Sequence, residues 1–298
     1  MRALLPATTV LAVVLLAGCA SLSIAPPAPV VQVTQQAQVP PPDDTLNATA
    51  WFQTSVERDL VFREIYRAAG EKLATALADK GWDALPRDDR DNDPRALPPA
   101  IIVDVDETVL DNSPNQVRQI RGGGEFNDAD WDRWVQQRDA RALPGAREFL
   151  ERAAAQGVTV FYISNRDAGQ AAATFDNLRH AGFPIAGTRQ FLGKGTVVAG
   201  CVARGSDKGC RRRSVGREYR VLMQFGDQVG DFVDIASNTR DGRRAAIAPY
   251  LDWVGERWWT LPNPVYGSWE PALFDNDWRQ PAAARRAAKE AALDDARK

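Results

Sequence analysis

Residues 101–113, IIVDVDETVLDNS, place strongly acidic residues directly after an apolar run. The preceding residues 100–103, AIIV, are typical of a buried strand. Carboxylates are rarely buried unless a cation or a hydrogen-bond donor accompanies them. A strand that runs straight into Asp104 and Asp106 therefore indicates a polar site at the end of a buried sheet.

Two further apolar runs, at residues 158–163 (VTVFYI) and 219–225 (YRVLMQF), have the same character. Helical patterns at residues 143–157 and 168–182 lie between the strands, and each ends at a glycine. Alternating strands and helices predict an α/β fold with a parallel sheet flanked by helices.

Each of the three predicted strands ends in polar side chains. In chain order these are Asp104 and Asp106, then Ser164 and Asn165, then Asp227 and Asp231. Ligands of open α/β sheets bind beyond the carboxyl ends of the strands, so neighbouring strands would bring the four aspartates together. Four negative charges in one cleft need a cation among them, and oxygen ligands favour a hard ion such as Mg²⁺.

The N-terminal residues 1–18 are typical of a signal peptide, because one Arg precedes an apolar run that is too short for a membrane span. LAGC at residues 16–19 resembles a bacterial lipobox, which implies cleavage before Cys19 and acylation of that residue. Several acyl chains would hold the protein stably on a membrane. Ala20 favours the outer membrane by resemblance to bacterial lipoproteins. The alternative is a plain signal peptide with a chance Cys19.

Residues 19–45 are rich in Pro, Ala and Gln and predict a tether between the lipid and the folded domain. A formal net charge of −2 offers no broad basic surface for nucleic acid. Cys201 and Cys210 are either a disulfide formed in an oxidising compartment or two free thiols.

Six stretches in this order resemble the haloacid-dehalogenase (HAD) superfamily, and more closely its class C acid phosphatases, the bacterial lipoprotein 5′-nucleotidases. They are VDVDETVLDNSP, FNDADWDRWV, ALPGAREFL, VFYISNR, FGDQVGDF and LPNPVYGSWE. The resemblance as a whole covers about residues 51–269. The resemblance implies a HAD-like acid phosphatase domain at residues 46–279, with a parallel sheet flanked by helices. It also implies a smaller helical part over the site, from residues 46–95 and 111–142. Residues 280–298 form an Ala-rich charged tail, for which a solvated helix and a disordered segment are the two alternatives, and no function is assigned to it.

The resemblance also assigns roles to the acidic residues. Asp104 would attack phosphorus to give an aspartyl-phosphate, and Asp106 would protonate the leaving group and then activate water. The Asp104 carboxylate, the Asp106 backbone carbonyl and the Asp227 carboxylate would hold Mg²⁺. Asp231 would support this metal shell.

Three further positions follow from the same motifs. Ser164 and the backbone N–H of Asn165 would bind a phosphoryl oxygen. A lysine would counter the charge of the phosphoryl group and of Asp104, and Lys208 is preferred for this role. Lys194 is the alternative, because residues 195–207 form a longer insertion than is usual in the family.

Two aromatic residues, Trp131 and Tyr266, match positions that sandwich the base of a nucleoside monophosphate in this family. Base stacking contributes about 1–3 kcal/mol per base and tolerates many bases. The alternative for Trp131 is a place in the core.

The implied function is a Mg²⁺-dependent acid phosphatase of the outer membrane, facing the periplasm or the cell surface. It would act on small phosphate monoesters, with nucleoside 5′-monophosphates as the expected substrates. His180 is the only histidine, which excludes the phosphatase classes that need a nucleophilic histidine or several histidine ligands. The alternative is a catalytically silent surface lipoprotein for binding or adhesion. A phosphotransferase would use the same residues. The sequence gives no indication of the oligomeric state.

Overall fold

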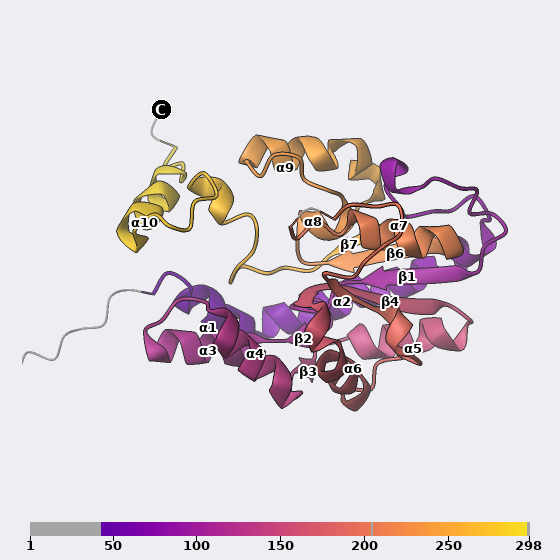
Figure 1. The fold of residues 1–298 in the computed structure, drawn as a ribbon, viewed down its shortest axis with the longest axis horizontal. Coiled ribbons are helices and arrows are strands. Elements are labelled where there is room, and N and C mark those ends of the chain that lie inside the picture. The colour runs from indigo at the N-terminus through magenta and orange to yellow at the C-terminus, as the bar shows by residue number, and fades with distance from the viewer. Residues whose placement is uncertain (1–42, 204, 297–298) are drawn as a thin grey trace, which may run out of the picture. The chain divides into compact units, whose positions relative to one another are not determined.

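The computed structural model describes residues 43–203 and 205–296. Its main sheet has five parallel strands in the order β5-β4-β1-β6-β7. The strands are β1 (Pro99–Val103), β4 (Thr159–Asp167), β5 (Phe191–Lys194), β6 (Arg220–Gly226) and β7 (Trp258–Thr260). The chain moves from β1 outward through β4 to β5 and then crosses to β6, so the strand order reverses beside β1 (Figure 1). A ligand site is expected at the carboxyl end of this switch point.

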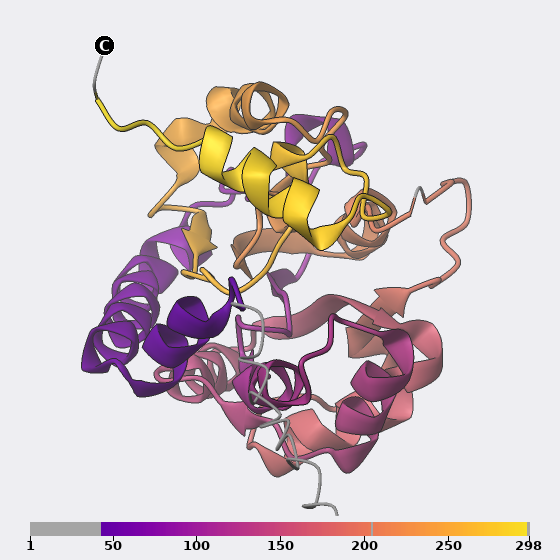
Figure 2. The same cartoon turned by 90° about the vertical axis from the view of Figure 1, so that its left-hand side faces the viewer.

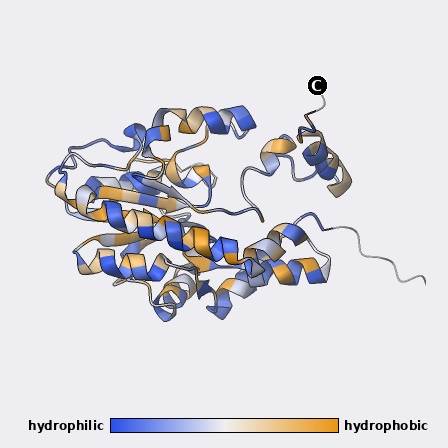
Figure 3. Ribbon diagram, turned by 180° about the vertical axis from the view of Figure 1, so that it is seen from behind, coloured by the Kyte–Doolittle hydropathy of each residue, from blue (hydrophilic) through white to orange (hydrophobic). Residues whose placement is uncertain are grey.

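Helices cover both faces of the sheet (Figure 1). The α-helices of the described part are α1 (Leu46–Thr54), α2 (Val56–Ala78), α3 (Ser113–Gly122), α4 (Asp128–Gln137), α5 (Ala146–Ala155), α6 (Ala171–His180), α7 (Gly209–Glu218), α8 (Val229–Phe232), α9 (Arg240–Ile247) and α10 (Ala282–Ala291). A two-stranded antiparallel pair, β2 (Leu110–Asp111) with β3 (Arg141–Ala142), encloses α3 and α4. Along their length the helices alternate hydrophilic and hydrophobic residues (Figure 3), as expected for helices with one face on a core.

Each face of the sheet has its own hydrophobic core, because successive side chains of a strand point to opposite sides. Ile101 and Val103 of β1 lie in the cluster packed by α2, α5 and α6. Ala100 and Ile102 lie in the cluster packed by α7 and by the 3₁₀ helix η4 (Ala248–Trp253). This burial on both faces explains why the predicted strands are continuous apolar runs.

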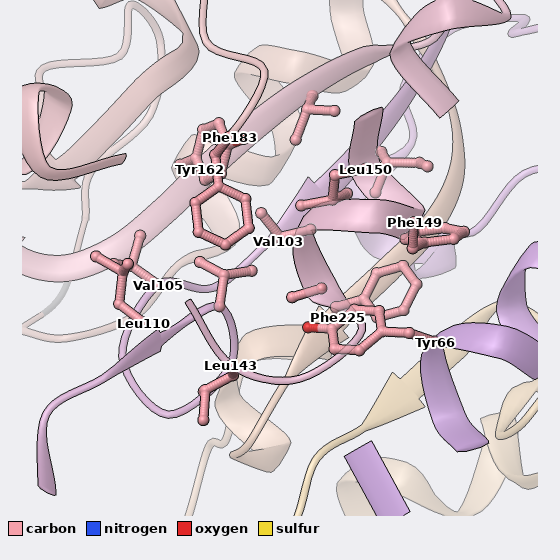
Figure 4. Close-up of a cluster of buried hydrophobic side chains, with 14 of the residues drawn as sticks. Tyr66, Val103, Val105, Leu110, Leu143, Phe149, Leu150, Tyr162, Phe183 and Phe225 are labelled. Carbon is pink, nitrogen blue, oxygen red and sulfur yellow. The ribbon is translucent and has the colours of Figure 1, made fainter. Parts of the chain in front are cut away.

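The aromatic side chains of Tyr66, Phe149 and Phe225 join α2, α5 and β6 (Figure 4). Tyr66 stacks on Phe225 with 5.3 Å between ring centroids. Its hydroxyl donates a hydrogen bond of 2.8 Å to the carbonyl of Thr108, in the loop that follows β1. Glu107 in this loop has a φ of 56°, which is uncommon for a residue other than glycine. The Tyr66 hydrogen bond therefore ties the acidic loop to the core beneath it.

The predicted parallel α/β fold is confirmed, and the three strands expected from the sequence are the neighbours β4, β1 and β6. The first two helices, α1 and α2, are separated at Ser55, whose side chain accepts a hydrogen bond of 3.0 Å from the Arg58 amide and so begins α2. The segment at residues 46–95 therefore has two parts, since α1 contacts α3 whereas α2 packs against the sheet and α5. For the tail at residues 280–298, where the sequence allows either a solvated helix or disorder, the structure has the helix α10.

Cys201 and Cys210 form a disulfide, so of the two alternatives the structure has the bonded one. The bond connects the first turn of α7 to the segment before it. Among residues 43–203 and 205–296, no helix combines the length and apolar composition that crossing a bilayer requires. Cys19, the signal peptide at residues 1–18 and nearly all of the tether at residues 19–45 lie outside the described residues.

Candidate active site

Three aspartates meet at the carboxyl end of the two central strands. Asp104 follows β1, Asp227 follows β6 and Asp231 lies in α8. One carboxylate oxygen of each lies within 4.8 Å of the others, and they form a candidate metal-binding group within the described residues. Gly226 makes this approach possible, because a Cβ at that position would lie 2.3 Å from the Cβ of Asp231.

Lys208 lies inside this cluster at the start of α7. Its Nζ donates hydrogen bonds to Asp104 Oδ1 at 2.5 Å and to Asp231 Oδ1 at 2.6 Å. Lys194, the alternative lysine, is exposed, and its Nζ lies 3.5 Å from Asp167, which is not part of the acidic cluster. The structure therefore brings Lys208, and not Lys194, to the acidic cluster.

Burial and mutual repulsion set the electrostatics of the three carboxylates. Burial raises the pKa of Asp104 to about 7, and the charge of Lys208 only partly opposes this. Burial, followed by the charges of Asp231 and Asp104, raises the pKa of Asp227 well above its ordinary value. Burial disfavours the charge on Lys208, but Asp104 and Asp231 together raise its pKa. A divalent cation would favour the ionised carboxylates, so this all-oxygen donor set fits Mg²⁺.

Asp106 is held beside this cluster by donors from β4 and from the segment after β2. Its Oδ2 accepts a hydrogen bond of 3.1 Å from the Ser164 hydroxyl. Its Oδ1 accepts bonds from Arg166 Nε at 2.9 Å and from Asn112 Nδ2 at 2.8 Å. The Arg166 side chain is only 1% exposed, so this ion pair is almost shielded from water. All these contacts are donated to Asp106, which fixes the orientation of its carboxylate.

Ser164 and Asn165 both lie in β4, because the strand continues past residue 163, where the sequence pattern ends it. Ser164 is fully buried, and its hydroxyl contacts Asp106. Asn165 is exposed, and its side-chain oxygen accepts a hydrogen bond of 2.8 Å from Arg211. Burial lowers the pKa of Arg211 to about 10. Arg211 also donates to the Ser164 carbonyl at 2.5 Å, so it joins the end of β4 to the first turn of α7.

The two predicted base-binding aromatics are half-buried and belong to different parts of the fold. Trp131 lies in α4, with the Arg166 guanidinium 5.4 Å from its ring centroid. Tyr266 follows β7, and its hydroxyl donates to the Glu107 carboxylate. Burial, followed by the charge of Asp106, raises the pKa of Glu107 well above its ordinary value. Through Arg166 and Glu107, both aromatics connect to the loop that carries Asp104 and Asp106.

Residues 8–269 match the model of the HAD superfamily subfamily IIIB acid phosphatases. The chain belongs to this acid phosphatase family. Its fold is similar to the class C acid phosphatase of Bacillus anthracis, with a TM-score of 0.72 and 32% identity over 84% of this chain and 96% of that one. A second structure of that enzyme, with tungstate bound, matches equally well. The resemblance inferred from the motifs is therefore confirmed.

The chain is also similar to plant proteins, at lower sequence identity. A stem 31 kDa glycoprotein of Glycine max is 29% identical over 55% of this chain and 58% of its own length. Acid phosphatase 1 of Solanum lycopersicum is 27% identical over 55% of this chain and 57% of its own length. The chain thus spans a little over half the length of these plant relatives.

Four residues that contact the site have no role assigned from the sequence motifs. They are Glu107, Asn112, Arg166 and Arg211. The sequence does indicate a role for Arg166. It follows an apolar strand, where an arginine would be buried, and a buried arginine needs a carboxylate partner. Arg211 lies in a run of three arginines, and nothing in that run separates a buried arginine from a surface one.

Proposed function

We propose that the protein is a Mg²⁺-dependent acid phosphatase that hydrolyses small phosphate monoesters, nucleoside 5′-monophosphates in particular, through an aspartyl-phosphate on Asp104. The observation that carries the proposal is the placement of Lys208 between Asp104 and Asp231 in a buried site. A lysine and several aspartates are the groups that phosphoryl transfer needs for charge neutralisation and attack.

In this mechanism Asp104 attacks phosphorus while Lys208 orients its carboxylate and neutralises charge on the phosphoryl oxygens. Asp106 donates a proton to the leaving alkoxide and later takes a proton from the attacking water. Arg166 and Asn112 hold Asp106 in place for both steps. Mg²⁺ at Asp104, Asp227 and the Asp106 carbonyl, with Asp231 in support, would neutralise the phosphoryl group so that one anion can attack another.

A nucleoside as the leaving group is supported by two half-buried aromatic rings, Trp131 in α4 and Tyr266 after β7. The tungstate held by the Bacillus anthracis relative is a tetrahedral oxyanion of the same shape as phosphate. That relative supports an oxyanion site in this family, and the aromatic pair supports a flat leaving group.

We place the enzyme outside the inner membrane, on the outer membrane through acylated Cys19, facing the periplasm or the surface. The lipobox-like LAGC at residues 16–19 supports this placement. The disulfide between Cys201 and Cys210 also supports it, because disulfides persist in oxidising compartments.

The test is phosphate release from nucleoside 5′-monophosphates and from β-glycerophosphate at acidic pH by the protein from Ala20 onward. We expect activity with Mg²⁺ and a loss of at least about 100-fold with EDTA, restored by added Mg²⁺. A folded, Mg²⁺-loaded protein that releases phosphate from neither substrate would support the alternative of a silent binding lipoprotein. Adding glycerol as an acceptor separates hydrolysis from phosphotransfer.

Lys208 and Lys194 offer a matched pair of substitutions. Lys208→Ala should lower kcat about 100- to 1000-fold, because it removes a buried preorganised donor. Lys194→Ala should leave kcat within about twofold of wild type, since exposed ion pairs contribute little. Both values come from steady-state kinetics on β-glycerophosphate. The assignment of Lys208 fails if the Lys194 variant is the impaired one.

A further inference from the structure

A buried arginine in the C-terminal helix α10 has no place in the proposed catalytic machinery. Arg285 is 8% exposed, although it lies on a short Ala-rich helix. Its Nη1 donates to the carbonyls of Trp278 at 3.0 Å and of Gln280 at 2.6 Å, and its guanidinium lies 5.4 Å from the Trp278 ring centroid. Its Nη2 donates to the carboxylate of Glu125. The Arg285 guanidinium thus holds the turn that precedes α10 and also contacts a loop that is distant in sequence.

Glu125 belongs to the loop between α3 and α4, and it follows three successive glycines: Gly122, the last residue of α3, and then Gly123 and Gly124. Three successive glycines leave the backbone of this loop with unusual conformational freedom. In the described part of the chain, Glu125, whose side chain is 66% exposed, pairs with Arg285, whose side chain is 10% exposed. The contact therefore fixes one point of an intrinsically adaptable loop.

A continuous series of contacts leads from this loop to Asp106. Phe126 follows Glu125, is 58% exposed, and has its ring centroid 6.3 Å from that of Trp131. Trp131 lies against the Arg166 guanidinium, which donates to Asp106. A leaving group that extends beyond Asp106 would contact Phe126 and Trp131, whereas a small leaving group would not reach these two rings.

The same helix also pairs with the segment that follows Tyr266 and with the residues that precede α1. Lys289 pairs with Glu270 at 3.1 Å and with Asp44 at 2.8 Å, and Arg286 also pairs with Asp44. Glu270 lies four residues after Tyr266. In Figure 2, α10 lies in front of the sheet, between α9 and the N-terminal helices. The helix thus connects the two segments that bear the two aromatic residues of the site.

The match to the family model ends at residue 269, so α10 and the segment that leads into it lie beyond that match. We infer that Arg285 is a positioning residue that sets the affinity for phosphate monoesters with a large leaving group by holding Glu125, and with it Phe126 and Trp131. The inference rests on the proposed function. It adds a specificity element outside the residues that match the family model.

The test compares a nucleoside 5′-monophosphate with β-glycerophosphate. Both substrates release an alcohol, but the nucleoside is much larger than glycerol. Arg285→Ala should raise KM about fivefold for the nucleotide and leave kcat, as well as KM for β-glycerophosphate, within about twofold of wild type. Arg285→Lys should recover only part of the loss, because lysine lacks the planar fork of donors. Arg286→Ala is the matched control, a cation of the same helix that does not contact Glu125, and should retain the wild-type KM values.

A double-mutant cycle isolates the proposed contact. Glu125→Gln should raise the nucleotide KM like Arg285→Ala, and the double variant should be no worse than either single one. Equal KM changes for both substrates, an unchanged nucleotide KM in folded Arg285→Ala, or simply additive effects would each overturn the inference.

A readout without catalysis separates this inference from the proposed function. Trypsin cleavage after Arg121, next to the three glycines, should be faster in Arg285→Ala than in wild type or in Arg286→Ala, because the loop has lost its fixed point. Equal cleavage rates overturn the contact even in an active enzyme. A wild type that hydrolyses neither phosphate ester would instead contradict the proposed function, while the cleavage comparison still tests the contact.

Discussion

Replacing Asp104 by Asn is expected to lower kcat by at least about 10⁴-fold, the largest effect of any substitution in this chain. Asn keeps the size of the side chain and can still contact Lys208, but its amide oxygen is a poor nucleophile towards phosphorus. Asp104 also belongs to the candidate metal group, so the substitution removes one ligand as well as the attacking atom.

The control is the thermal unfolding of the metal-free variant at pH 7. The folded protein raises the pKa of Asp104 to about 7, above its value in an unfolded chain. A carboxyl group with a raised pKa opposes folding at any pH above the unfolded value, because the unfolded state loses the proton more readily. The metal-free Asp104→Asn variant should therefore melt no lower than metal-free wild type, although it is inactive.

The measurement is phosphate release under Mg²⁺, together with the melting temperature without metal. A variant that is folded and retains more than about 1% of wild-type kcat would show that another group attacks phosphorus. A variant that melts far below wild type would show that Asp104 supports the fold, and its inactivity would then say nothing about the nucleophile.

The centre of the sheet and most of the acidic cluster could be predicted from local sequence alone. The strands β1, β4 and β6 are buried on both faces, so each is an apolar run of distinctive length. Polar residues that directly follow such a run must lie at the carboxyl edge of the sheet. For this reason Asp104, Asp227 and Asp231 were found together, as the structure places them.

The remaining parts depend on contacts that are distant in sequence. The edge strands β5, of four residues, and β7, of three residues, are too short to show a pattern, and within the described residues each pairs with a single neighbour. The choice between Lys194 and Lys208 depends on the path of residues 195–207, which no local pattern specifies. Arg285 sits in an Ala-rich tail that looks solvated by composition, and its burial follows from the fold of Trp278 and Gln280 around it.

Replacing Asp106 by Asn should separate the two chemical steps of the proposed reaction. With a nucleotide or β-glycerophosphate, kcat should fall about 10³-fold, because a ribose or glycerol oxygen leaves slowly without a proton donor. With p-nitrophenyl phosphate the leaving group needs no proton, so the first step should survive. The contacts with Ser164, Arg166 and Asn112 can be retained in part by the side-chain oxygen of Asn.

The second step fails in this variant for every substrate, since hydrolysis of the aspartyl-phosphate needs Asp106 as the base. Stopped-flow kinetics on p-nitrophenyl phosphate should therefore show a rapid burst of up to one nitrophenolate per protein molecule, followed by a slow steady rate. Wild type should show the fast steady rate instead. A variant with no burst, and equally slow on both classes of substrate, would assign Asp106 to holding Arg166 and the loop after β1 rather than to proton transfer. A burst that exceeds one equivalent would mean that water still attacks the intermediate, and that a base other than Asp106 activates it.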